Sequence, residues 1–162
     1  MKTILRSLAF LFVCAIGISC ESDDGPSYKF LDRDLSGEID NEAWAYEDGY
    51  AEIDDFGGEE MLDINLTLVQ AQSGCDIFIP EGNQVFFSVP NAVGLYKLSF
   101  DFNGGESQTV TLWDDSKSLN IICGDGAVQI LSITANEVSG RIDARSDKDS
   151  HVNGNFTLNI CP

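Results

Sequence analysis

Hydrophobic and polar residues alternate along much of the chain, as they do in strands that bury one face. One run alternates at every position: Leu62, Asp63, Ile64, Asn65, Leu66, Thr67 and Leu68. Seven further runs are rich in β-branched and aromatic residues: Gln84–Val89, Leu95–Phe102, Gln108–Trp113, Ser118–Cys123, Val128–Ala135, Val138–Ala144 and Gly154–Cys161. No window shows a helical stripe. The pattern therefore predicts a chain built from strands.

Short turn-forming segments separate these runs, among them Asn103-Gly104-Gly105 and Gly124-Asp125-Gly126. We also expect a hairpin over Trp44–Ile53, turning at Asp48-Gly49. Short connections favour antiparallel pairing of neighbouring strands. We predict an all-β fold for one domain over residues 31–162, namely an antiparallel β-sandwich of roughly eight to ten strands. A closed up-and-down β-barrel is the alternative.

The N-terminus has the features of a signal peptide over residues 1–19. Lys2 and Arg6 form a short basic start, and an unbroken apolar run follows from Leu8 to Ile16. This run is shorter than the roughly 20 residues that a membrane-spanning helix needs. Gly17-Ile18-Ser19-Cys20 resembles a bacterial lipobox, and this resemblance implies cleavage before Cys20 and lipidation of its thiol. The alternative is a secreted protein that is cut elsewhere.

Residues 20–30 are predicted to form a flexible tether after the lipidated cysteine. The segment from Glu21 to Pro26 is polar and acidic, so it has no apolar area to bury. An acidic stretch directly after the cysteine resembles the export signal of surface lipoproteins in some Gram-negative bacteria. The resemblance implies an outer-membrane protein exposed at the cell surface; a linker that faces the periplasm is the alternative.

A glycine-containing strand entry occurs twice, at Leu35–Asp40 and at Val138–Asp143. Together with Trp44 and the glycine-containing C-terminal strands, this order resembles small β-rich outer-membrane lipoproteins of unknown function. That resemblance implies a fold and names no catalytic residue.

The charge of the chain is strongly negative. There are 27 acidic and 9 basic residues among 162, which gives a formal net charge of −18. Few basic groups are available to bind phosphates, and an acidic surface is repelled by a polyanion. Nucleic acid is therefore excluded as a partner.

The segment 32–40 resembles the first part of an EF-hand calcium loop. Oxygen-bearing side chains have the required spacing, and Gly37 lies at the turn position. However, Ala43 stands where a closing Glu is needed. A strand entry explains the segment equally well. The candidate calcium ligands are Asp32, Asp34, Ser36, Glu38 and Asp40.

Three cysteines follow Cys20 in the sequence: Cys75, Cys123 and Cys161. An exported protein meets an oxidising compartment, so we expect one disulfide and one free thiol, with three possible pairings. If successive strands run alternately up and down, Cys75 and Cys123 lie at the same end of the sheet. We therefore favour a Cys75–Cys123 disulfide.

Aromatic side chains in the early hairpin are a candidate ligand platform. Trp44 and Tyr46 lie two residues apart, so strand alternation places them on one face. Such a face suits a sugar ring or a peptide. Packing into the core is the alternative, because a small β-domain needs aromatic side chains there.

No motif selects a catalytic residue. The chain has no G-x-S-x-G, and its one histidine, His151, lies in a polar segment where we expect an exposed hairpin tip. We therefore expect a non-catalytic binding or structural module that needs no cofactor. Its lipid anchor would hold it at the membrane, and its further partner would be a glycan or a protein. The alternatives are a cell-envelope hydrolase that uses two carboxylates and a calcium-assisted ligand-binding module.

Overall fold

The computed structural model describes residues 28–71, 73–76, 81–146 and 149–162, and its fold is all-β, as predicted. In this part of the chain no helix is long and apolar enough to cross a membrane. The elements are β1 (Ser36–Ile39), β2 (Glu42–Ala45), β3 (Asp48–Phe56), β4 (Glu59–Thr67), η1 (Gly74–Asp76), β5 (Gln84–Pro90), β6 (Gly94–Lys97), β7 (Val110–Asp114), β8 (Leu119–Cys123), β9 (Asp125–Ile133), β10 (Glu137–Arg145) and β11 (His151–Cys161).

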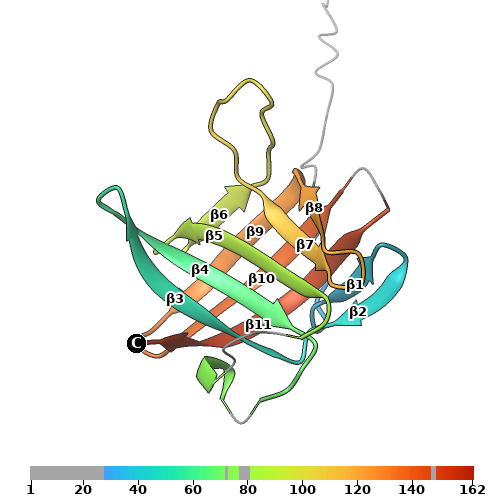
Figure 1. Cartoon of the computed structure of the whole chain (residues 1–162). Coiled ribbons are helices and arrows are strands. Elements are labelled where there is room, and N and C mark those ends of the chain that lie inside the picture. The colour runs from blue at the N-terminus through green and yellow to red at the C-terminus, as the bar shows by residue number, and fades with distance from the viewer. Residues whose placement is uncertain (1–27, 72, 77–80, 147–148) are drawn as a thin grey trace, which may run out of the picture.

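The strands form one strongly curled, eleven-stranded sheet, so the prediction of a sandwich of two sheets is wrong. The order along the sheet is β6-β9-β10-β11-β3-β4-β5-β7-β8, and the β1–β2 hairpin is attached to β11. Long twisted strands fold the sheet over on itself, and its two halves then face each other across the core (Figure 1). The sheet path ends at β6 and β8, so a closed up-and-down barrel is not formed either.

One parallel pair joins the two halves of the sheet. Residues 159–161 of β11 lie beside residues 50–52 of β3 and run in the same direction. All other strand pairs in the described chain are antiparallel. Sequence neighbours such as β3–β4 and β10–β11 pair as the short turns predict, whereas the parallel contact joins strands that are far apart in the sequence.

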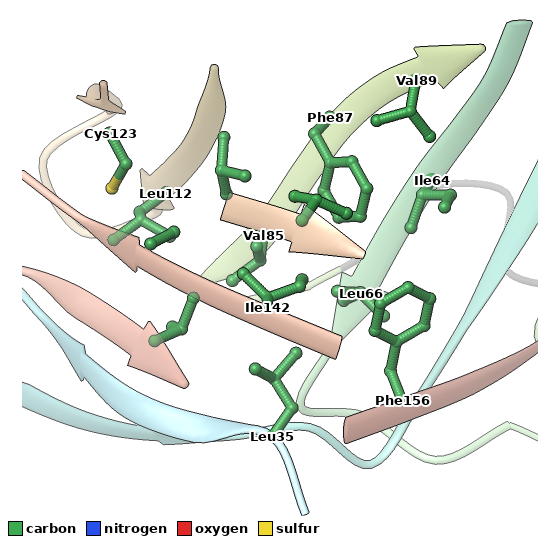
Figure 2. Close-up of a cluster of buried hydrophobic side chains, with 14 of the residues drawn as sticks. Leu35, Ile64, Leu66, Val85, Phe87, Val89, Leu112, Cys123, Ile142 and Phe156 are labelled. Carbon is green, nitrogen blue, oxygen red and sulfur yellow. The ribbon is translucent and has the colours of Figure 1, made fainter. Parts of the chain in front are cut away.

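Alternate side chains of both halves point inward and fill the core. Leu62, Ile64 and Leu66 are buried, which confirms the alternation read from the sequence. Figure 2 shows side chains from several strands meeting in this core. Phe87 of β5 packs edge-on against Phe156 of β11, with ring centroids 6.1 Å apart. Full burial of each large apolar side chain contributes about 1.5–3 kcal/mol, so this shared core holds the curled halves together.

The early hairpins lie elsewhere than predicted. Asp48-Gly49 opens β3 instead of turning, because the Asp48 carboxylate accepts hydrogen bonds from the backbone N–H groups of Gly49 (2.8 Å) and Ala71 (2.9 Å). The first hairpin turns at Asp40 and Asn41, which both have positive φ (51° and 68°). The second turns at residues 57 and 58, both glycines.

Residues 28–33 lie across β10 and β11, on the face opposite the core. The backbone N–H of Lys29 donates to Asp143 Oδ2 (2.7 Å), and the Lys29 carbonyl accepts from Asn153 Nδ2 (2.9 Å). The Arg141 guanidinium lies 4.4 Å from the centre of the Phe30 ring. The folded domain therefore includes residues 28–30, which we assigned to the tether.

The disulfide joins Cys75 to Cys161, with a Cα–Cα distance of 5.6 Å, so the predicted Cys75–Cys123 pair is wrong. The end of β11 lies beside β3 and contacts η1, which carries Cys75. Cys123 instead points into the core as a free thiol, where burial raises its pKa to about 12. Strand counting failed because it assumed sequential pairing and missed the parallel return of β11.

Removing the disulfide should lower stability substantially. Its cysteines are 86 residues apart, and a bridge across a loop of this length typically contributes about 2–5 kcal/mol. We expect Cys75→Ser to lower the free energy of unfolding by that amount in urea titrations. Cys123→Ala is the control, since it should leave the bridge intact in mass spectrometry of the unreduced protein. Loss of the bridge in Cys123→Ala would contradict the Cys75–Cys161 pairing.

Candidate binding cleft

The predicted calcium ligands are spread along an extended segment. Ser36 and Glu38 belong to β1, whereas Asp32 and Asp34 precede it and Asp40 follows it. In the described ranges no group of three or more His, Cys, Asp or Glu side chains is placed to hold a metal ion. The extended backbone of β1 explains this, because an EF-hand loop must instead wrap around its ion.

Two of these acidic residues have structural contacts. Asp40 forms an ion pair with Lys117, and its backbone N–H donates to Ser150 Oγ (2.9 Å). Asp32 Oδ1 accepts a hydrogen bond from Asn155 Nδ2 (3.2 Å). These contacts fasten the segment to the loop after β7 and to β11.

The predicted aromatic platform is part of the core. Trp44 is buried, and its indole N–H donates to the carbonyl of Asn83 (2.9 Å). Tyr46 packs against the same core and donates its hydroxyl to the carbonyl of Thr157. Burial raises the pKa of Tyr46 to about 12, with a further contribution from the charge of Asp48. Core packing, the alternative reading of these residues, is therefore confirmed.

A cleft of about 660 Å³ lies at one end of the curled sheet. It lies where the loop between β6 and β7 meets β8, the start of β9 and the end of β10. Figure 1 shows this loop projecting beyond the strands. Its apolar wall includes Phe100, Phe102 and Ile122, and its polar lining includes Asn120, Asp125 and Arg145.

Two exposed aromatic rings dominate the apolar wall. Phe100 and Phe102 pack nearly perpendicular to each other, with ring centroids 4.6 Å apart. Phe100 is 47% exposed and Phe102 is 91% exposed. A ring as exposed as that of Phe102 contributes little to the stability of the domain. Together they form an apolar surface that lies outside the core.

Backbone contacts hold this pair in place. Ser99 and Gln108 exchange two backbone hydrogen bonds (2.8 and 3.0 Å), which close the base of the loop. Inside the loop, the N–H of Asp101 donates to Ser107 Oγ (3.0 Å). Gly124, between β8 and β9, lets the backbone approach Phe100 closely, because a Cβ there would lie 3.0 Å from the Phe100 Cβ.

A network of charged residues forms the polar side of the cleft. The Arg145 guanidinium contacts Asp125 Oδ2 (3.1 Å) and Asp143 Oδ2 (2.9 Å). The hydrogen bond with Asp125 is the main cause that raises the pKa of Arg145. Asp143 is buried beneath Lys29, whereas the side chain of Asp125 is 58% exposed. Among the described lining residues, Asp125 is the only carboxylate.

Sequence reasoning missed this cleft. We assigned Phe100 and Phe102 to a strand over Leu95–Phe102, but β6 ends at Lys97, and both rings lie in the loop between β6 and β7. The sequence did contain a sign of this loop, because the stretch directly after Phe102 is polar and rich in glycine, as loops typically are. His151 is also placed differently from our expectation, because it begins β11 opposite Arg145.

Comparisons with known proteins add no relative. No protein-family model matches the chain, and neither the curated protein sequences nor the solved structures contain a match.

Proposed function

We propose that this protein is a lipid-anchored, non-catalytic binding module of the cell envelope, and that its cleft binds an amphipathic ligand. The observation that carries the proposal is the exposed Phe100–Phe102 pair beside a cleft of about 660 Å³. Sites for small ligands typically have roughly 300–1,000 Å³ and combine apolar walls with a few polar groups.

The cleft favours a ligand with an apolar ring or chain and one polar end. The apolar part would cover Phe100, Phe102 and Ile122, which are exposed in the free protein. The polar end would meet the exposed carboxylate of Asp125 and the Asn120 amide, so it should carry a hydrogen-bond donor.

The arrangement supports binding rather than hydrolysis. Glycoside hydrolysis by two carboxylates needs a pair about 5–9.5 Å apart on opposite sides of the bond. Asp125 is the only carboxylate in the described lining, and Arg145 holds it in an ion pair. One carboxylate that is already paired with a guanidinium does not supply the two carboxyl groups that this reaction needs. The calcium-assisted alternative has no observation in its favour, because the predicted ligands do not converge.

The position of the N-terminal segment supports a cleft that is held near a membrane. Lys29 contacts Asp143, two residues before Arg145 in the cleft. The proposed lipid site, Cys20, lies outside the described residues. Tyr28 lies eight positions after Cys20, and an extended chain over eight positions spans at most about 29 Å. A lipid on Cys20 would thus keep Tyr28, where the described chain begins, within about 29 Å of the bilayer, at the cell surface or, alternatively, facing the periplasm.

Removing both phenyl rings should abolish most of the ligand binding. The probe is N-phenyl-1-naphthylamine, a neutral aromatic amine with one N–H donor, whose fluorescence rises in apolar surroundings. We expect the double substitution Phe100→Ala/Phe102→Ala to weaken its binding about tenfold or more, since two apolar contact faces are lost. The thermal midpoint should change little, because both rings lie outside the core.

The matched control removes two exposed apolar side chains away from the cleft, with Val93→Ala/Leu131→Ala. This variant should bind the probe as the natural protein does. Equal losses in both double variants, or unchanged binding after loss of both rings, would contradict the proposed site.

Replacement of the proposed lipid site should release the protein from membranes. The change Cys20→Ala removes the only thiol of the lipobox, so no diacylglycerol is attached. We expect the variant in the soluble fraction after ultracentrifugation, while the natural protein sediments with membranes and partitions into detergent. Cys123→Ala is the control and should remain in the membrane fraction. A Cys20→Ala protein that still sediments with membranes would contradict lipid anchoring.

A further inference from the structure

A second concave site lies on the outer face of β3, β4 and β5, opposite the core. It is a groove of about 230 Å³. Two rows of side chains cross the three strands here, because the register aligns Tyr50 with Asn65 and Phe86, and Glu52 with Asp63 and Ser88. This groove belongs to a different part of the sheet from the cleft.

The first row places an amide between two aromatic rings. Tyr50 and Phe86 are on strands separated by β4, so their backbones lie about 10 Å apart, with Asn65 between them. Phe87, the residue after Phe86, points inward and packs in the core. The Phe86 side chain points to the outer face and takes no part in that core. Both aromatic side chains are partly exposed and line the groove, and an aromatic ring attracts a cation that lies over its face.

The second row brings two carboxylates together. Glu52 and Asp63 are directly opposite each other on neighbouring strands, and like charges in such a pair destabilise a sheet. Asp63 accepts a hydrogen bond from the Ser88 hydroxyl. No basic side chain within the described ranges forms an ion pair with either carboxylate. The pKa of Tyr50 is raised by burial and by the charge of Glu52, in agreement with a negative potential in the groove.

The amide in the first row lacks one partner. Asn65 donates through Nδ2 to Gln84 Oε1 (3.4 Å), but its Oδ1 atom is buried and accepts no hydrogen bond. A buried acceptor without a donor lowers stability. Glu52 and Asp63 thus present open acceptors in the groove, beside the unpaired Oδ1 atom of Asn65.

We propose that this groove binds a cationic side chain, the ammonium group of a lysine or the guanidinium group of an arginine, on a basic peptide or protein partner. Such a group carries only donors and a positive charge. It would offset the repulsion between Glu52 and Asp63, supply donors to the groove's acceptors, and lie between the faces of Tyr50 and Phe86. The net charge of −18 would further accelerate the approach of a basic partner.

The test measures the affinity of the domain for N-acetyl-tetralysine amide by calorimetry, with N-acetyl-tetraglutamine amide as the neutral comparison. We expect binding of the lysine peptide only. The double substitution Glu52→Gln/Asp63→Asn should weaken it about tenfold or more. The same variant should have a higher thermal midpoint than the natural protein, because the like-charge pair is removed.

The matched control is Asp55→Asn/Glu60→Gln, which removes another pair of opposed carboxylates from the same hairpin, outside the groove. It should change the affinity less than twofold if the site is specific. Equal loss in the two double variants would show unspecific charge attraction and overturn the proposal.

A third variant tests the aromatic wall without changing the charge. Phe86→Ala should weaken lysine-peptide binding several-fold, whereas Phe102→Ala in the other site should leave it unchanged. Unchanged binding in Phe86→Ala, or equal binding of the glutamine peptide, would overturn the proposed cation site. Neither result depends on whether the cleft at Phe100 and Phe102 binds its own ligand.

Discussion

The parallel contact between β11 and β3 is the constraint on which the rest of the fold depends. It joins the half of the sheet formed by β6, β9, β10 and β11 to the half formed by β3, β4, β5, β7 and β8. Because the last long strand lies beside the first, the sheet curls around one core, where Phe156 meets Phe87. The same contact brings Cys161 to the segment that carries Cys75, so the disulfide fastens the end of the strand that closes the fold.

This architecture leaves two concave surfaces outside the core. At the end of the curled sheet, the loop after β6 leaves the strands and carries two phenyl rings outside the core, beside the Arg145–Asp125 pair. On the outer face, β3, β4 and β5 align two rows of side chains that the core does not use. We propose an amphipathic ligand for the first surface and a cationic side chain for the second. Both proposals describe a molecule that binds partners rather than transforms them.

Local patterns predicted the strands well, and non-local contacts explain the errors. Leu62, Ile64 and Leu66 alternate with polar residues because one face of their strand is buried. This pattern lies within a single strand, so the sequence of that strand is enough to predict it. The pairing of Cys75 and the single curled sheet depend on a contact between strands about one hundred residues apart, which no local pattern encodes. For the candidate sites, the sequence allowed Trp44 to lie either in the core or on a ligand platform. Phe102 was missed because the strand predicted to contain it ends at Lys97. The acidic groove requires the register of three strands, which the sequence leaves open.

The most direct test of this account is nuclear magnetic resonance of the backbone at the β11–β3 contact. A single curled sheet predicts cross-strand nuclear Overhauser effects in a parallel pattern, with Ile160 beside Ala51 and with the flanking residues 159 and 161 beside 50 and 52. Amide protons in this contact should also exchange slowly with solvent. An antiparallel pattern there, or the absence of any contact between the two strands, would contradict a single curled sheet and favour two separate sheets.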